Sequence, residues 1–176
     1  MGRYLAVDYG RRRIGVAVSD PLGLTARPLE TIDLAAGVGG KPGSDWRASP
    51  GALRRSAERL GALCREHEAR GVVVGEPRDL GGAAAAGAAW IAARVAELRA
   101  ALDAGGLASV TIDRLDERGS TQAALGGAAR SRISERDLRE SGRLDAMAAA
   151  VILRQFLAEL PPRPVEAPEP LPHRED

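Results

Sequence analysis

Acidic residues at three separated places in the sequence could together carry out metal-dependent chemistry. Asp8 ends an apolar run, Asp116 and Glu117 directly follow an alternating run, and Asp145 lies at the start of the last amphipathic segment. Carboxylates brought into one place repel one another unless cations lie between them, and oxygen ligands favour Mg²⁺ or Mn²⁺ over zinc. Two such ions about 4 Å apart would clamp a phosphodiester and activate water. The sequence therefore predicts a two-metal centre for phosphodiester hydrolysis.

Each of these acids also has a simpler interpretation when it is taken alone. Asp8 could open a turn by bonding the backbone two residues on. The pair at 116–117 and Asp145 could occupy the first turns of helices, where acids stabilise the helix dipole. Gly10 and Gly15 follow Asp8 closely and are predicted to serve a tight turn rather than a phosphate. The two histidines lie far from the acids in the sequence, so a histidine-based mechanism is not expected.

The elements that must position these acids follow from the hydrophobic pattern. Period-two and short apolar runs predict strands, and apolar stripes at helical spacing predict helices. The expected order is strands 3–9, 13–19 and 27–32, helix 51–69, strand 71–75, helix 83–101, strand 108–115 and helix 143–159. This order predicts one α/β domain over residues 1–160, a mixed sheet with helices on its faces. We expect the ends of the first and fifth strands to lie side by side.

Composition sets limits on the class of protein. The chain has 176 residues, of which 44% are hydrophobic, which is enough for one core. No apolar run is long enough for a membrane span, and the N-terminus lacks a signal-peptide core, so cytoplasm is the expected location. Cys64 is the only cysteine, which excludes an internal disulfide, and we expect it to be buried. The Pro- and Glu-rich tail at 161–176 is expected to be disordered.

Several short motifs resemble those of the YqgF family, also called RuvX. In family order they are Leu5–Gly10, Arg13–Asp20, Thr25–Leu29, Val73–Pro77, Asp116–Ala123 and Asp145–Ala149. The family comprises pre-16S rRNA nucleases that are related in fold to Holliday junction resolvases. The resemblance implies an RNase H-like fold, a mixed five-stranded sheet flanked by helices, and an acidic active site that uses divalent metal.

The resemblance also implies roles for individual residues. Asp8, Glu117 and Asp145 match the family's catalytic acids, and Asp116 matches the neighbouring acid. Glu76 stands where the family has an apolar residue, and we count it as a further metal-facing acid. Residues expected to contact the substrate are Arg11, Arg118, Ser120, Thr121 and Arg143. For those at 118–121 the alternative is that they start the next helix.

The function expected from residues and resemblance together is a metal-dependent nuclease that processes the 5′ end of precursor 16S rRNA in ribosome biogenesis. Its partners would be nucleic acid and ribosomal particles. The nearest alternative is a resolvase of branched DNA, since the same fold and acids would serve either substrate. A dimer would suit a four-way junction and a monomer would suit end trimming. An actin-like ATPase would need two such domains, and a nucleic-acid-binding protein without catalysis would not need Asp8.

Overall fold

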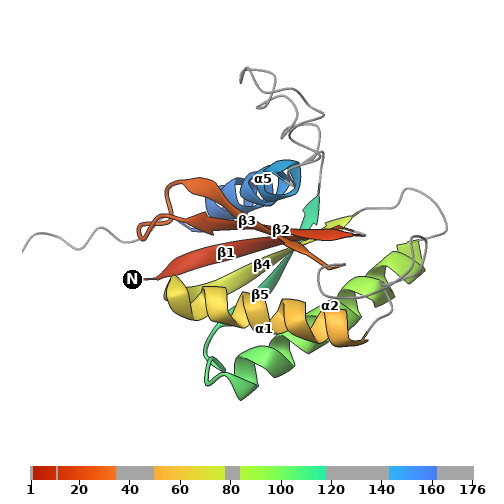
Figure 1. Ribbon diagram of the computed structural model, residues 1–176. Helices are drawn as coiled ribbons and strands as arrows, with labels where there is room; N and C mark the ends of the chain where they lie inside the picture. Colours follow the sequence, from red (N-terminus) through yellow and green to blue (C-terminus); the bar gives the residue numbers. More distant parts are fainter. Residues whose placement is uncertain (1, 11, 35–49, 78–83, 118–142, 162–176) are drawn as a thin grey trace, which may run out of the picture.

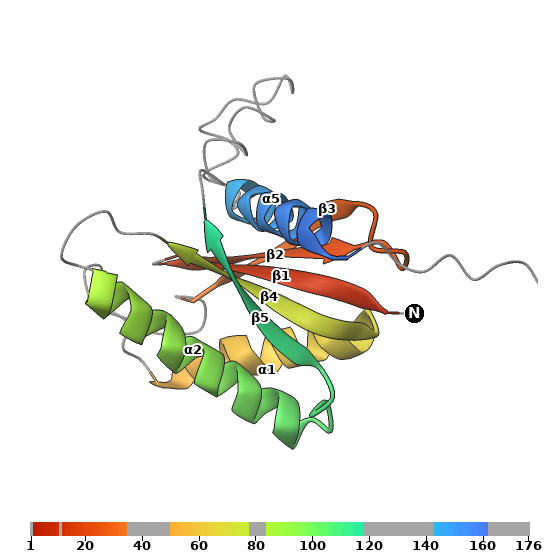
Figure 2. The same ribbon diagram turned by 180° about the vertical axis from the view of Figure 1, so that it is seen from behind.

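A central sheet with helices on both faces forms the protein, as seen in a computed structural model (Figures 1 and 2). The structure describes residues 2–10, 12–34, 50–77, 84–117 and 143–161. Within them the elements are β1 (Arg3–Tyr9), β2 (Arg13–Ser19), β3 (Ala26–Asp33), α1 (Pro50–Glu66), β4 (Ala69–Pro77), α2 (Ala84–Ala104), β5 (Thr111–Glu117) and α5 (Arg143–Glu159). Of the tail predicted at 161–176, residues 162–176 lie outside the described residues.

The sheet has five strands in the order β3-β2-β1-β4-β5. The first three strands form an antiparallel meander, whereas β4 pairs parallel with β1 and β5 pairs parallel with β4. The predicted mixed five-stranded sheet is therefore confirmed. Each parallel strand follows a helical crossover, α1 before β4 and α2 before β5, which is the usual way to join parallel neighbours.

The expectation that the first and fifth strands lie side by side is wrong, because β4 lies between β1 and β5. Strand β4 takes the place beside β1, and β5 is then added outside β4. Backbones separated by one intervening strand are about 10 Å apart. Any site that joins the ends of β1 and β5 must therefore reach across the end of β4.

Several predicted boundaries also shift, and two of these shifts have a clear cause. The helix expected to reach residue 69 ends at Glu66, because Glu68 turns the chain with a φ of 51° and Ala69 already pairs with β1. The last strand begins at Thr111, three residues later than expected, because a turn centred on Gly106 occupies the preceding residues. It continues to Glu117, so the acids at 116–117 belong to the strand and not to a helix start.

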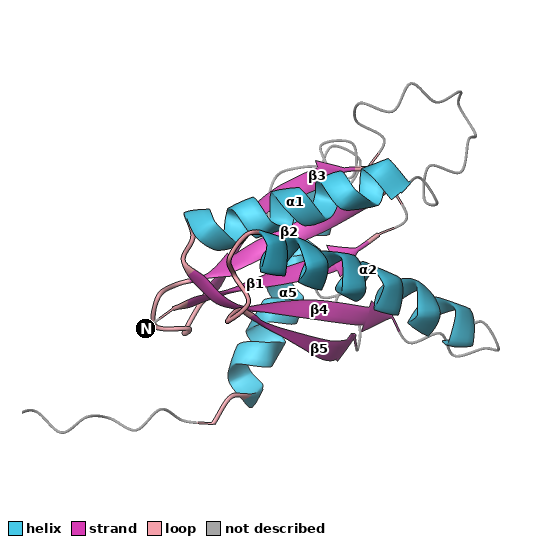
Figure 3. Ribbon diagram, turned by 90° about the horizontal axis from the view of Figure 1, so that it is seen from below, coloured by secondary structure: helices cyan, strands magenta, loops and turns pink. Residues whose placement is uncertain are grey.

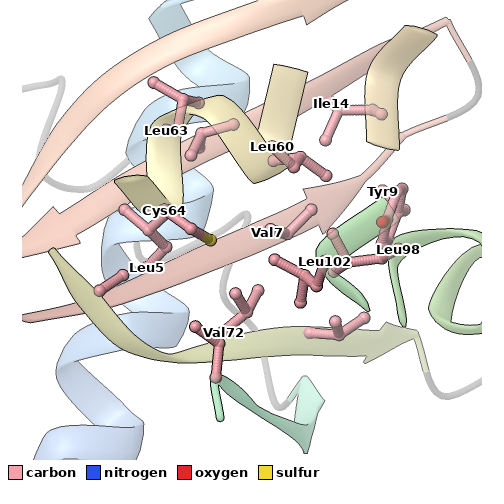
Figure 4. Packing of buried hydrophobic residues seen from close by; sticks show 14 of the residues in the cluster. Leu5, Val7, Tyr9, Ile14, Leu60, Leu63, Cys64, Val72, Leu98 and Leu102 are labelled. Carbon is pink, nitrogen blue, oxygen red and sulfur yellow. The ribbon is translucent and has the colours of Figure 1, made fainter. Parts of the chain in front are cut away.

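The face of the sheet covered by α1 and α2 holds the larger core. Leu5, Val7 and Ile14 point from the sheet toward Leu60 of α1 and Leu98 of α2, among other buried residues (Figure 4). The two helices lie side by side across this face (Figure 3). Cys64 belongs to this core and is 1% exposed, which confirms its predicted burial, and that burial raises the pKa of its thiol to about 11.

The face covered by α5 is built from smaller side chains. Ala6, Ala17 and Val73 of the sheet pack against Ala149 and Ala150 of α5. Small residues let the helix axis approach the strands closely. No helix in the described ranges has the length and apolarity needed to cross a membrane.

Candidate active site

Gly15 allows the first turn of α5 to rest directly on the sheet. A Cβ at this position would overlap the carbonyl group of Asp145 and would lie 2.9 Å from the backbone nitrogen of Ala146. Gly15 lies inside β2 and is not among the described residues with positive φ. The prediction that it serves a turn is therefore wrong: its role is to permit close approach between strand and helix.

The same glycine brings two of the predicted acids together. Gly15 is the Cα partner of Asp8 in the antiparallel pair of β1 and β2. Tyr4 and Ala6 of β1 pack on the α5 face, and Asp8 continues this period-two series. Asp145 lies in the first turn of α5, above Gly15. The side chains of Asp8 and Asp145, each partly exposed, therefore converge where β1 ends and α5 begins.

A cation that the sequence analysis missed lies beside this pair of acids. Arg13 Nη1 is 3.9 Å from Asp145 Oδ2, and the two side chains are 25% and 34% exposed. An ion pair of this length and exposure contributes at most about 1 kcal/mol to stability. Its significance is positional, because it shows that the Asp145 carboxylate extends toward the start of β2. The signal was present in the sequence: Arg13 precedes Gly15 by two residues and so shares its face.

Glu76, in contrast, is directed away from the acid pair. It follows Val72 and Val74 in the period-two series of β4 that faces α1 and α2. Its carboxylate forms an ion pair with Arg114 of the neighbouring strand β5. The structure thus places Glu76 on the face of the sheet opposite Asp8.

The structure describes only some of the remaining predicted residues. Asp116 and Glu117 pair through their backbones with Glu76 and Pro77, while their side chains lie outside what the structure describes. Arg143 is the first residue of α5 and is exposed. Arg11, Arg118, Ser120 and Thr121 lie outside the described residues. Considering the described part alone, no three His, Cys, Asp or Glu side chains are grouped closely enough to hold a metal ion.

An aromatic cluster supports the end of β1 from the other face. Tyr9, the neighbour of Asp8, is 7% exposed and packs edge-on against Trp90 of α2, with ring centroids 6.2 Å apart. The guanidinium of Arg94 lies 3.9 Å from the centre of the Trp90 ring and donates a hydrogen bond to the Trp90 carbonyl oxygen. Burial raises the pKa of Tyr9, although the nearby Arg94 opposes this, so the phenol stays neutral at ordinary pH. The cluster holds the strand end that carries Asp8.

Proteins of one family are similar in sequence to this chain. The model of the family described as "RuvX: Holliday junction resolvase" matches residues 2–159. A protein of Streptomyces coelicolor named "Putative pre-16S rRNA nuclease" is 39% identical over 89% of this chain and 80% of its own length. A protein of the same name from Thermobifida fusca is 37% identical over 92% of this chain and 93% of its own.

A solved structure confirms the fold independently. The structure of T. thermophilus RuvC in complex with a Holliday junction substrate superposes with a TM-score of 0.53. It covers 90% of this chain and 95% of its own at 20% identity, a level that establishes the RNase H-like fold and nothing finer. The family model matches all five strands of the sheet, and these relatives are 37% and 39% identical to the chain, so the chain belongs to the RuvX family.

Proposed function

We propose that this protein is a metal-dependent nuclease that processes the 5′ end of precursor 16S rRNA. Its family and its relatives named as nucleases make it a hydrolase of phosphodiester bonds. The observation in the chain itself that carries the proposal is the convergence of Asp8 and Asp145 over Gly15. Processing of ribosomal RNA would take place in the cytoplasm, with precursor rRNA or ribosomal particles as partners.

The donor set around the acid pair suits Mg²⁺ or Mn²⁺. Asp8 and Asp145 supply carboxylate oxygens, and hard divalent cations prefer oxygen. Cys64 lies in the core on the opposite face, and His67 follows α1 beside Arg3, at the end of β1 remote from Asp8. The cysteine and the histidine among the described residues are thus kept away from the pair. We propose that Asp8, Asp145 and Glu117 hold the metal, and that Asp116, next to Glu117 in the chain, adds negative charge nearby.

Glu117 would complete the set from across β4. It pairs with Pro77 at the end of that strand, two strands away from Asp8. Val7 pairs with Val74 and Glu117 with Pro77, so Glu117 lies farther along the sheet than Asp8 as well as two strands, about 10 Å, to its side. The Glu117 side chain and bound metal ions would have to bridge that separation. When bound, the ions would polarise the phosphodiester and lower the pKa of an attacking water. We leave Glu76 out of the metal set because it is paired with Arg114 on the other face.

The cationic side chains would orient the substrate. Arg13 approaches Asp145 and offsets part of the negative charge that would otherwise repel a phosphate. Arg143 is exposed at the start of α5, where both its guanidinium and the helix dipole favour an anion. We propose that Arg11, Arg118, Ser120 and Thr121 add contacts to the substrate backbone.

The proposal is tested by comparing substrates side by side. Purified protein is incubated with single-stranded RNA, a precursor 16S rRNA fragment and a four-way DNA junction, each with Mg²⁺, with Mn²⁺ and with excess chelator. We expect the rRNA precursor to be cut in a metal-dependent way. Asp8→Asn, Glu117→Gln and Asp145→Asn should each abolish cleavage while nucleic-acid binding persists. Cleavage that survives in all three variants would show that the site is wrong.

A resolvase of branched DNA is the second candidate. The description of the matching family and the fold shared with RuvC favour it. Paired cuts at a four-way junction require two active sites, so this function predicts a homodimer. Sedimentation of the protein with and without the junction would separate the candidates: junction cleavage by a dimer, with the rRNA precursor left intact, would replace our first proposal.

A further inference from the structure

A groove lies on the side of α5 that faces away from Asp145. One wall is the outer strand β3, over residues 28–31, and the other is the first turns of α5. Its volume of 530 Å³ falls within the range of roughly 300–1,000 Å³ typical of ligand sites. Helix α5 lies over the part of the sheet to which β3 belongs, and the two elements are in contact (Figure 2).

One row of residues that pair across neighbouring strands links the groove to the acid pair. Asp8, Gly15 and Thr31 are successive Cα partners across β1, β2 and β3, and Thr31 lines the groove. At 100° per residue, Arg143, Ala146 and Met147 share one side of α5, whereas Asp145 lies on the other side. The groove and the acids thus lie on either side of the first turn of one helix, about 10 Å apart along the sheet.

The chemistry of the groove suits a nucleotide. Arg143 contributes an exposed guanidinium at its end nearest the start of α5. Met147 contributes partly buried apolar surface, against which a base or sugar can pack. Pro28 is exposed and pairs with Ala17, whose side chain lies on the α5 face, so its ring adds apolar surface on the same side. Proteins that bind unpaired bases without sequence preference stack them on flat side chains, usually aromatic, beside cations that follow the backbone. In this groove, aliphatic side chains would take the place of the aromatic ones.

The acidic residue that lines the groove, Glu30, is already paired with an arginine of a neighbouring helix. Glu30 accepts two hydrogen bonds from Arg59 of α1, at 3.0 Å from Nε and 2.6 Å from Nη2. A carboxylate held in a bidentate pair with a guanidinium repels a phosphate less than one without a cation. The charge that the groove presents is therefore dominated by Arg143.

We propose that this groove binds one unpaired nucleotide of the substrate strand, adjacent to the phosphate that is cleaved. Its phosphate contacts Arg143, and its base packs against Met147 and Pro28. The strand passes around the start of α5 to reach the Asp8–Asp145 pair. This inference rests on the proposed nuclease function and specifies where the nuclease binds its substrate strand.

The test combines changes in the protein with changes in the substrate. Cleavage of a labelled precursor 16S rRNA fragment and of a four-way junction in Mg²⁺ first locates the scissile phosphate. Nucleotides within three of it are then replaced one at a time by abasic residues, and kcat/KM is measured. With the unchanged protein, removal of one particular base should lower kcat/KM about tenfold. Met147→Glu should lower kcat/KM about tenfold on the intact substrate, yet the abasic substitution should then cause no further loss.

Arg143 provides a second variant that keeps the test valid if Met147→Glu fails to fold. Because acids stabilise a helix start, Arg143→Glu should leave the melting temperature unchanged or raised. It should weaken binding of the same fragment about tenfold or more. The matched control is Arg154→Glu, an exposed arginine further along α5, which should change binding less than about twofold.

Defined outcomes would overturn the inference. One is that the losses in kcat/KM from Met147→Glu and from the abasic substitution multiply when the two are combined. Another is that no single base is needed for cleavage. A third is that Arg154→Glu weakens binding as much as Arg143→Glu does. If these occur while cleavage still depends on Asp8, the groove is wrong and the nuclease function stands. If the protein neither cuts nor binds the fragment or the junction, both proposals fail together.

Discussion

The two faces of the sheet are built on different principles. The face under α1 and α2 interlocks large branched side chains, such as Ile14, Leu60 and Leu98, which are all fully buried. The face under α5 uses Ala6, Ala17 and one glycine, and it ends in charged residues. Large side chains supply most of the transfer free energy on burial, whereas small ones supply close approach. The first face accordingly stabilises the fold and the second positions the chemistry.

The sharpest contrast between the faces should come from Asp8→Asn. Asparagine keeps the shape of the side chain but removes the charge that holds a divalent ion, so we expect cleavage to fall about a thousandfold or more. The melting temperature should stay the same or rise, because the repulsion with Asp145 is relieved. The measurement is kcat/KM on the rRNA precursor together with a thermal melt. A large loss of stability with retained cleavage would reverse the assignment of the two faces.

Gly15→Ala should give the next largest effect. The added Cβ overlaps the Asp145 carbonyl, so α5 must lift from β2 and carry Asp145 with it. We expect activity to fall about a hundredfold and the free energy of unfolding to fall by about 2–4 kcal/mol.

Gly61→Ala on α1 is the matched control for Gly15→Ala. There a new Cβ would lie 3.9 Å from the Ala101 carbonyl oxygen, an ordinary van der Waals separation. Alanine is the better helix former, so this variant should gain up to about 1 kcal/mol and keep full activity. Equal effects from the two glycine substitutions would remove the distinction between the faces.

The contrast between these glycines also explains what the sequence could and could not predict. Periodicity located every described strand and helix, because the alternation of Ile14, Val16 and Val18 follows from which side is buried. It could not order β1, β4 and β5, since pairing between strands far apart in the chain leaves no periodic trace. The sequence also led to the wrong role for Gly15, a tight turn, because its actual role depends on contact with a helix about 130 residues later in the chain.

The candidate site divides in the same way. Asp8 and Asp145 were predicted from their places at the ends of elements, and the structure brings them together. Glu76 was predicted from the sequence as a further acid of the site. The alternation of side chains along this strand would have placed Glu76 on the same face as Val74, away from Asp8. Its ion-pair partner Arg114, however, was visible only in the structure. Glu117 remains a prediction, because its side chain is not described.

Leu98→Ala should affect stability without affecting catalysis. Leu98 is fully buried between α2 and the sheet, and truncation of such a residue costs about 2–5 kcal/mol. The free energy of unfolding in urea should fall accordingly, while kcat/KM at a temperature where the variant is folded should change less than about threefold. Alkylation of Cys64, whose thiol has a pKa of about 11 in this core, should become faster as the core opens. Unchanged alkylation with lost cleavage would indicate that this face also shapes the site.

The smallest effect should come from Glu76→Gln. If Glu76 belongs to the face under α1 and α2, the change only weakens an ion pair with Arg114 between side chains that are 37% and 44% exposed. Such a pair contributes about 0–1 kcal/mol, and cleavage should remain within about twofold of the unchanged protein. If Glu76 instead binds metal, the variant should require much more Mg²⁺ for half-maximal cleavage. A Mg²⁺ titration of both proteins therefore decides whether three acids or four form the site.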